Sequence, residues 1–294
     1  MKRRAFLGGL AATLISPVRA YADSGMKAPT SDELARYAWL DSETPIRKLE
    51  TSIASPSGFK RIDHDPASFG AWLRGFPLRE KGTPVKAFSG RVLHEGADAR
   101  VAAVAEIDCG TTDLQQCADS AIRLHAEWLW SRGEKSAIGY HFLSGDFATW
   151  PRYAAGERPK VDGNKVVWRS TAKPSESRAT FRSYLDMVFE FANTISLSKE
   201  CSSVDKSDLA VGDVFIQPGS PGHAVVVLDL ATSSKGARAA LLGQGFMPAQ
   251  DFHVLASGEA GLSPWFSLEG DTVDTPFWDP FPWSALKRFP KHAK

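Results

Sequence analysis

Two residues with complementary chemistry stand far apart in this sequence: a thiol at Cys117 and an imidazole at His223. A thiolate can attack a carbonyl carbon, while a neighbouring imidazole takes the thiol proton and later returns it to the leaving group. A helix N-terminus or an imidazolium lowers the pKa of a thiol and favours its reactive form. The two residues are so distant in the chain that only the fold can bring them together.

The segment around Cys117 has the pattern of an amphipathic helix from 113 to 131. Thr112 is placed to be its N-cap, with Gln115 three residues later as in a capping box, and Gly133 is a C-terminal stop signal. The residues at steps of three and four share one apolar face. They are Leu114, Cys117, Ala121, Leu124 and Trp128. We therefore expect Cys117 to face a sheet, near the positive end of the helix dipole.

The segment around His223 reads as strand, turn and strand. Strands are predicted at 214–217, 224–230, 239–243 and 252–255, and Pro and Gly residues at 218–222 mark the turn before His223. Gln244 is the polar residue that ends the third of these strands, so we assign it the role of orienting the imidazole. The Cys117 backbone N–H, aided by Gln115 or Gln116, is the candidate for stabilising an oxyanion.

The remaining pattern predicts an α+β fold with helices packed on one antiparallel sheet. A short helix is expected at 67–74, a strand at 102–107 and a second long helix from 177 to 192. The stretch 140–200 reads as an insert, and its role as a lid or as a specificity element stays open. We expect residues 23–294 to form a single domain.

The N-terminus has the three parts of a secretory signal peptide at 1–22. Basic residues at 2–4 precede an apolar run from Ala5 to Ile15, and Ala20-Tyr21-Ala22 supplies a cleavage site. The paired arginines before Phe6 also resemble a twin-arginine signal. We expect a periplasmic or secreted protein without a later membrane segment, and the net charge of +1 gives no basis for binding nucleic acid.

Other residues in the sequence allow alternative chemistries. Cys109 and Cys201 are either buried thiols or a disulfide that leaves Cys117 reactive. The sequence lacks H-x-x-x-H and C-x-x-C spacing, so we expect no metal and no cofactor, although Cys117, His223 and an acid remain an alternative zinc set. His253 close to Asp251 is interpreted as a surface or supporting residue. Trp128, Trp130, Trp150 and Trp168 either line a stacking cleft or anchor the core.

The segment from 213 to 230, with Gly-Asp before an apolar run and Gly-His before another, resembles NlpC-type peptidoglycan endopeptidases and CHAP amidases. That resemblance implies a papain-like core with Cys117 as nucleophile, His223 as base and Gln244 as the polar third residue, acting on cell-wall peptides. Two features depart from those families. Ala118-Asp119-Ser120 follows the cysteine in place of their usual context, and the distance from cysteine to histidine requires an insert.

A resemblance over most of the chain is to an exported bacterial family known as domain of unknown function 4846. It is carried by Gln115-Gln116-Cys117-Ala118-Asp119, Gly212-Asp213-Val214, Ser220-Pro221-Gly222-His223 and Met247-Pro248-Ala249-Gln250-Asp251. It implies export and supplies no activity. The sequence thus predicts a cysteine peptidase or amidase acting on a peptide or peptidoglycan-like substrate. The competing hypothesis is a non-catalytic periplasmic binding protein on the same scaffold.

Overall fold

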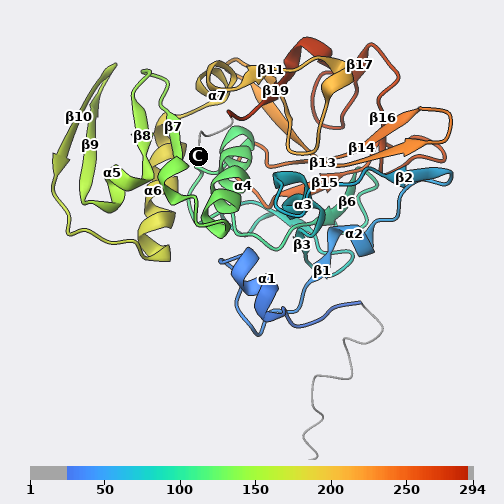
Figure 1. Cartoon of the computed structure of the whole chain (residues 1–294), viewed down its shortest axis with the longest axis horizontal. Coiled ribbons are helices and arrows are strands. Elements are labelled where there is room, and N and C mark those ends of the chain that lie inside the picture. The colour runs from blue at the N-terminus through green and yellow to red at the C-terminus, as the bar shows by residue number, and fades with distance from the viewer. Residues whose placement is uncertain (1–24, 291–294) are drawn as a thin grey trace, which may run out of the picture.

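An antiparallel sheet of nine strands forms the centre of the computed structural model, which describes residues 25–290 (Figure 1). The predicted signal peptide at 1–22 lies outside the described residues. The main path of the sheet runs β11 (Ser202–Ser203), β19 (Leu286–Arg288), β12 (Val214–Gln217), β13 (His223–Ser233), β14 (Arg238–Gln244), β15 (His253–Leu255) and β6 (Val101–Val104). In addition, β16 (Phe266–Ser267) pairs with β14, and β2 (Phe59–Arg61) pairs with β13. Each of these pairs is antiparallel, as predicted.

The four strands predicted in the last third of the chain are confirmed as β12 to β15. In β13 and β14 nearly every residue is buried, because these central strands are covered on both faces. The register pairs Val226 with Gly243, and a bulge between Val227 and Asp229 interrupts the ladder. Gln244 is the last residue of β14, as expected, while β6 ends at Val104 and is shorter than the predicted strand.

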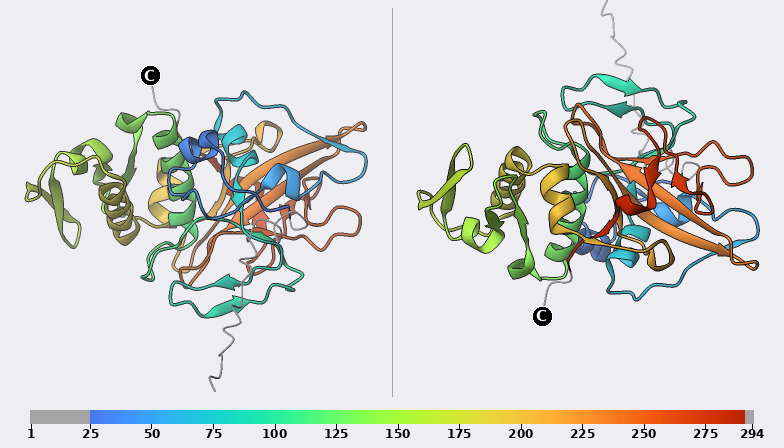
Figure 2. Two further views of the ribbon diagram at one scale, coloured as in Figure 1. Left: turned by 90° about the horizontal axis from the view of Figure 1, so that it is seen from below. Right: turned by 90° about the horizontal axis from the view of Figure 1, so that it is seen from above.

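Helix α4 (Cys117–Ser131) packs against β13, and Figure 2 shows it between the large sheet and a separate group of helices and hairpins. The prediction of its start was wrong. The helix begins at Cys117, four residues later than expected, and Gln116 rather than Thr112 is the N-cap. Tight turns precede it instead, with the Leu114 N–H donating to the Thr112 carbonyl and the Gln116 N–H to the Leu114 carbonyl. Leu114 therefore lies outside the helix.

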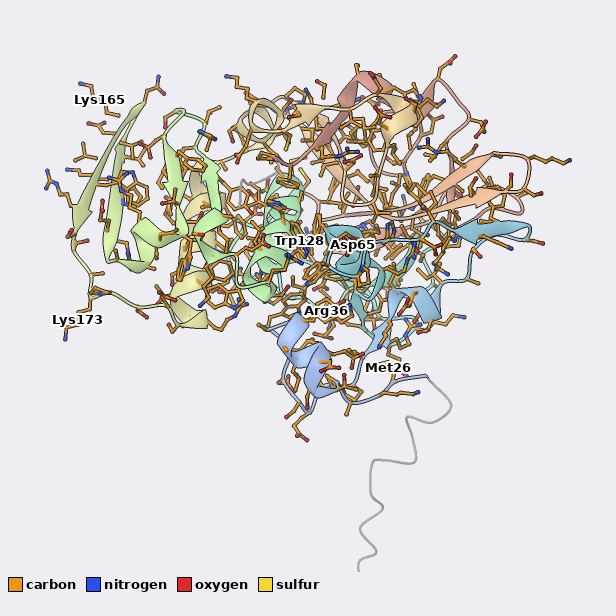
Figure 3. All side chains as sticks on the ribbon, viewed as in Figure 1. Met26, Arg36, Asp65, Trp128, Lys165 and Lys173 are labelled. Atoms are coloured by element: carbon orange, nitrogen blue, oxygen red, sulfur yellow. The ribbon has the colours of Figure 1, made fainter. Side chains whose placement is uncertain are left out.

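The predicted insert forms a lobe on the far side of α4 from the sheet (Figure 1). It contains the hairpins β7–β8 and β9–β10, with helices α5 and α6. Their bounds are β7 (Gly139–His141), β8 (Phe147–Thr149), α5 (Trp150–Ala154), β9 (Glu157–Asp162), β10 (Lys165–Ser170) and α6 (Arg178–Phe191). Ser177 caps α6, matching the prediction for this helix within a residue. Lys165 and Lys173 lie at the outer edge of the lobe (Figure 3).

Short elements complete the structure around the sheet. They are α1 (Ser31–Arg36), β1 (Arg47–Lys48), α2 (Leu49–Ser52), α3 (Phe69–Arg74), β3 (Pro77–Leu78), β4 (Val85–Lys86), β5 (Val92–His94), α7 (Thr194–Glu200), β17 (Thr272–Val273) and β18 (Phe281–Pro282), with 3-10 turns at Lys135–Ala137, Lys206–Asp208 and Trp283–Ala285. Among residues 25–290, no helix has the length and apolar character needed to cross a membrane.

Candidate functional site

Cys117 stands at the first position of α4, so its sulfur lies at the end of the helix where backbone N–H groups lack partners within the helix. Asp119, in the first turn, accepts the Gln116 N–H through Oδ2 at 3.1 Å, which fixes the entry into the helix. Its other carboxylate oxygen, Oδ1, has no hydrogen-bond partner among the described residues. Burial raises the pKa of Asp119 to about 8, although the Gln116 N–H opposes this.

The sulfur of Cys117 touches the strand that carries His223. Its Sγ lies 3.8 Å from the Gly222 carbonyl oxygen, and the Ala224 backbone N–H also acts on the thiol. The sulfur therefore lies against the backbone on both sides of His223. The fold thus brings Cys117 to the start of the strand that begins with His223, at the point where α4 meets β13.

Gly222 is required at this contact. A Cβ added there would lie 2.3 Å from Thr194 Oγ1, 2.7 Å from the Gly219 backbone nitrogen and 2.8 Å from the Gln217 carbonyl oxygen. Thr194, at the start of α7, itself donates to the Gly219 carbonyl and accepts the Gly219 N–H, both at 3.3 Å. These two hydrogen bonds hold the turn before His223 against Thr194, at the end of the insert.

A line of hydrogen bonds extends from His223 to the next strands. His223 Nε2 lies 2.7 Å from Gln244 Oε1, and Gln244 Nε2 lies 3.3 Å from His253 Nε2. His253 Nδ1 is in turn 3.0 Å from the Asp251 carbonyl oxygen. The three side chains are almost fully buried. The other ring nitrogen of His223, Nδ1, has no hydrogen-bond partner among residues 25–290.

Aromatic side chains cover the imidazole of His223. The ring centroids of Phe246 and Trp278 are each 4.9 Å from that of His223, and Phe281 is at 6.0 Å. Trp278 is fixed by donating its indole N–H to Gln217 Oε1 at 2.6 Å. These rings contribute to the complete burial of the imidazole. None of them offers a hydrogen-bond donor or acceptor to Nδ1.

The electrostatics of the pair differ from the expectation that the thiol pKa is lowered. Burial, followed by the charge of Asp119, raises the pKa of Cys117 to about 11, while the N–H groups of Ala224 and Ala118 oppose the shift. Burial lowers the pKa of His223 to about 4, and the Gln244 bond opposes it. At neutral pH the pair is a thiol beside a neutral imidazole. The helix N-terminus is present, yet desolvation is the larger effect.

A cavity of about 340 Å³ opens onto Cys117. Its walls are the segment that leads into α4, the first turn of α4, residues between 189 and 194 at the end of the insert, the turn 219–222, and Met247. We call it the Cys117 cavity. The insert therefore supplies one wall of the space in front of the sulfur, which the sequence left open.

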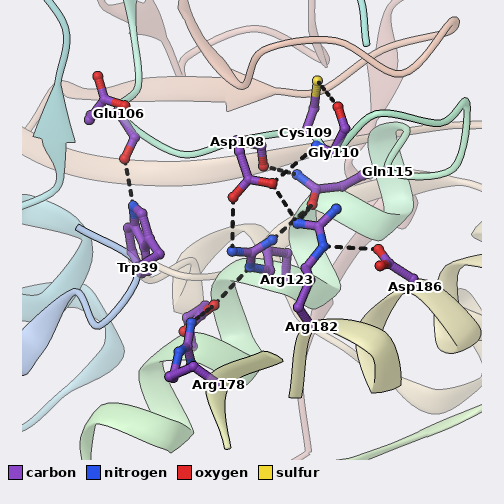
Figure 4. Close-up of polar contacts among 11 residues, drawn as sticks. Trp39, Glu106, Asp108, Cys109, Gly110, Gln115, Arg123, Arg178, Arg182 and Asp186 are labelled. Carbon is purple, nitrogen blue, oxygen red and sulfur yellow. Dashed lines mark hydrogen bonds and ion pairs between the residues drawn. The ribbon is translucent and has the colours of Figure 1, made fainter. Parts of the chain in front are cut away.

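Gln115 lies in a different environment from the one predicted. Its Oε1 accepts from Arg123 and Arg182, each at 3.2 Å, and its Nε2 donates to the Asp108 carbonyl at 3.3 Å (Figure 4). With its amide committed to this charged cluster, Gln115 does not stabilise an oxyanion in this geometry. Gln116 does line the Cys117 cavity, and its Nε2 donates to Asp113 Oδ1 at 3.1 Å.

The structure supports none of the three alternatives that the sequence offered, which were a disulfide, a zinc site and a tryptophan-lined cleft. All three cysteines are buried free thiols, so the alternative disulfide between Cys109 and Cys201 is absent. Among residues 25–290, no group of three or more His, Cys, Asp or Glu side chains is placed to hold a metal ion, and the alternative zinc set finds no third ligand. The tryptophans do not share a cleft: Trp150 is fully buried, and Trp130 packs on it at 5.6 Å.

A second cavity, of about 570 Å³, lies beside the C-terminal half of α4. We call it the Trp128 cavity, because Trp128 lines it together with Asp65, Phe69, His125 and Phe289. Trp128 and Asp65 lie near each other in Figure 3. His125 stacks on Phe289 at 4.1 Å with nearly parallel rings, and its Nδ1 is 3.0 Å from the Tyr140 hydroxyl. This imidazole is therefore held by packing and by a buried phenol.

Sequence reasoning settled His253 only in part and missed Asp119. His253 was interpreted as a surface or supporting residue, and its full burial behind Gln244 contradicts the first alternative and agrees with the second. Its alternation with Asp251 along the chain was the available signal. Asp119 was not singled out at all, although an acid two positions after a candidate nucleophile at a helix start is a visible pattern.

The family model described as Domain of unknown function (4846), DUF4846, matches residues 49–288. The chain belongs to this family. The match covers Cys117, His223, Gln244 and His253, so the whole DUF4846 region contains both the large sheet and the insert. No curated protein and no solved structure gives a significant match to the chain.

Proposed function

We propose that this DUF4846 protein is an exported cysteine hydrolase with a papain-like core that cleaves a peptide or amide bond. One observation carries the proposal. The sulfur of Cys117 lies against the backbone on both sides of His223, whose Nε2 is held by Gln244 while Nδ1 has no partner among the described residues. This is the division of roles that a nucleophile, a base and an orienting group require.

The reaction begins with a neutral pair. As Cys117 Sγ attacks the substrate carbonyl carbon, its proton passes to His223 Nδ1, and the carbonyl oxygen becomes an oxyanion. The Cys117 backbone N–H at the start of α4 is the donor proposed for that oxyanion. Collapse of the intermediate breaks the C–N bond, and the imidazolium returns the proton to the leaving amine. Water then hydrolyses the thioester, with His223 again acting as base, and frees the thiol.

The Cys117 cavity supports a peptide-like substrate. Its lining includes the carboxyl side chains of Asp113, Asp119 and Glu190 and no lysine or arginine. A neutral segment, or one that carries an amine, suits this lining better than a carboxylate does. Cell-wall peptides contain both amide bonds and free amines, and the predicted signal peptide would deliver the protein to the compartment that holds them.

The test is hydrolysis of purified peptidoglycan and its soluble stem peptides by the purified protein, with new amines and product masses as the readout. We expect Cys117→Ala to lose activity completely, because the nucleophile is removed. The matched control is Cys109→Ala, which removes another buried thiol. Activity that survives Cys117→Ala, or that is lost equally in the Cys109 variant, contradicts the proposal.

A second function is favoured by the high pKa and burial of the thiol: a periplasmic protein that binds a peptide without cleaving it. In that case Cys117→Ala binds the same stem peptides as the wild-type protein and neither releases amines. Calorimetric titration of both proteins with intact peptides, followed by mass analysis of the recovered peptide, separates the two functions.

A further inference from the structure

The line from His223 to Asp251 fixes the protonation of each atom along it, beginning at its far end. The Asp251 carbonyl oxygen accepts hydrogen bonds and cannot donate them. His253 Nδ1, at 3.0 Å from that oxygen, must therefore carry a hydrogen. Burial lowers the pKa of His253 to about 4, so the ring is neutral at pH 7 and its Nε2 has no hydrogen. His253 Nε2 is consequently an acceptor.

The orientation of the Gln244 amide follows from this. Only the NH2 group of Gln244 can donate to His253 Nε2, which places Gln244 Nε2 toward His253 at 3.3 Å. The amide oxygen must then face His223, at 2.7 Å from its Nε2. Since that oxygen accepts, His223 Nε2 must carry the ring hydrogen, and Nδ1 presents a lone pair.

We propose that His253 is a positioning residue that fixes the amide of Gln244 and thereby holds His223 in the tautomer with a hydrogen on Nε2. The two imidazoles are held in opposite tautomers by one amide between them and one backbone carbonyl at the end. In the opposite tautomer, Nδ1 of His223 would carry the ring hydrogen and would have no lone pair to accept the thiol proton. The transfer of the Cys117 proton to that lone pair rests on the proposed function. The assignment of the two tautomers does not depend on it.

The geometry gives His253 no direct part in chemistry. It lies behind Gln244 as seen from His223, it is fully buried, and it packs at 5.9 Å from His94 and 6.2 Å from Phe277. An apolar ring of similar size would fill the same space. Such a ring would leave the Gln244 amide free to turn, because the acceptor that orders it is lost.

The experiment is a two-bond ¹H–¹⁵N correlation spectrum of the histidine rings in the folded, ¹⁵N-labelled protein at pH 7. Protonated and unprotonated ring nitrogens resonate in separate ¹⁵N regions, so each tautomer is read directly. Spectra of His223→Phe and His253→Phe assign the signals. We expect a hydrogen on Nε2 of His223 and on Nδ1 of His253. A hydrogen on Nδ1 of His223, or on Nε2 of His253, overturns the proposal.

His253→Phe and His253→Gln form the matched pair that tests the control by His253. In His253→Phe we expect the His223 signals to shift toward an average of both tautomers and alkylation of Cys117 by iodoacetamide to slow about 5-fold, the equivalent of one neutral hydrogen bond. His253→Gln retains an acceptor and should restore both readouts. An unchanged His223 tautomer in His253→Phe contradicts the proposal. Should that variant fail to fold, the wild-type spectrum decides.

Failure of the proposed function gives a different result. The protein would then show opposite tautomers for His223 and His253 while releasing no amine from any cell-wall peptide. Wrong tautomers together with a Cys117-dependent hydrolysis would instead overturn only the role of His253.

Discussion

Helix α4 has a cavity near each end. His125 lines the Trp128 cavity, whereas His223 lies just after the turn 219–222 that lines the Cys117 cavity. Near the first residue of α4, His223 has one ring nitrogen held by Gln244 and the other without a partner among the described residues, next to a strand that touches a thiol. Near its last turns, His125 stacks on Phe289 and bonds to Tyr140. The Trp128 cavity is the larger of the two.

The proposed function thus assigns the reaction to the smaller of the two cavities. The Trp128 cavity offers volume and aromatic walls, yet its imidazole is committed to structural contacts. The Cys117 cavity is smaller, and the turn 219–222 in its wall leads directly into His223, where a buried line of donors and acceptors begins. The proposed reaction requires such a line, because a base must be oriented on one side and available on the other.

The largest expected effect separates the two imidazoles. We expect His223→Ala to lower the rate of hydrolysis by about 10²- to 10⁴-fold, the usual contribution of a general base. His125→Phe should leave the rate unchanged and instead lower the free energy of unfolding by about 1–3 kcal/mol, because the buried Tyr140 hydroxyl loses its partner. Rates and urea unfolding curves for both variants check this. Loss of hydrolysis in His125→Phe would contradict the structural role assigned to His125.

The next effect concerns Asp119. Burial raises the pKa of this carboxyl to about 8 in the folded protein, whereas the unfolded chain releases the proton near the ordinary value of 3.8. Between those values the folded state binds more protons, so stability falls as pH rises, by at most about 1.4 kcal/mol per pH unit. Asp119→Asn should remove this slope, as judged by urea unfolding from pH 5 to pH 8. Identical slopes in both proteins contradict the assignment.

The smallest effect compares two glycines. Gly222→Ala forces a Cβ to within 2.3 Å of Thr194 Oγ1 and to within 3 Å of two backbone atoms, so we expect a loss of about 1–3 kcal/mol. Gly70, in α3 beside the Trp128 cavity, meets its nearest atoms at 3.2 Å. There the helix propensity gained by alanine, about 1 kcal/mol, offsets the crowding. Equal losses of unfolding free energy in the two variants would show that the turn before His223 is not tightly packed.

The sequence was sufficient for the strands of the last third of the chain, while the roles of Cys117 and His223 stay predictions. Alternation and apolar runs located β12 to β15, and the position of Gln244 at the end of β14 followed from the same pattern. These predictions succeeded because local periodicity and burial agree in this part of the chain. The signal peptide, the papain-like core and the hydrolytic activity remain predictions.

Long-range contacts account for what the sequence did not yield. Thr112 had the local pattern of an N-cap, but Asp113 Oδ1 accepts the Ala249 N–H at 2.7 Å, and this contact belongs to the turn before α4. Gln115 accepts a hydrogen bond from Arg182, a residue of the insert, and is not available to an oxyanion. The thiol pKa rises because the surrounding segments bury it. Each of these outcomes depends on residues that are remote in the chain, and no local pattern contains them.

The most direct test of the site is site-resolved alkylation of the three thiols in the native protein, with iodoacetamide and peptide mass mapping over a series of times. All three are buried, but Cys117 lines a cavity and lies against the strand of His223. We predict that Cys117 is modified faster than Cys109 and Cys201, and that His223→Ala removes its advantage. Equal rates for the three cysteines in the folded protein would contradict the account.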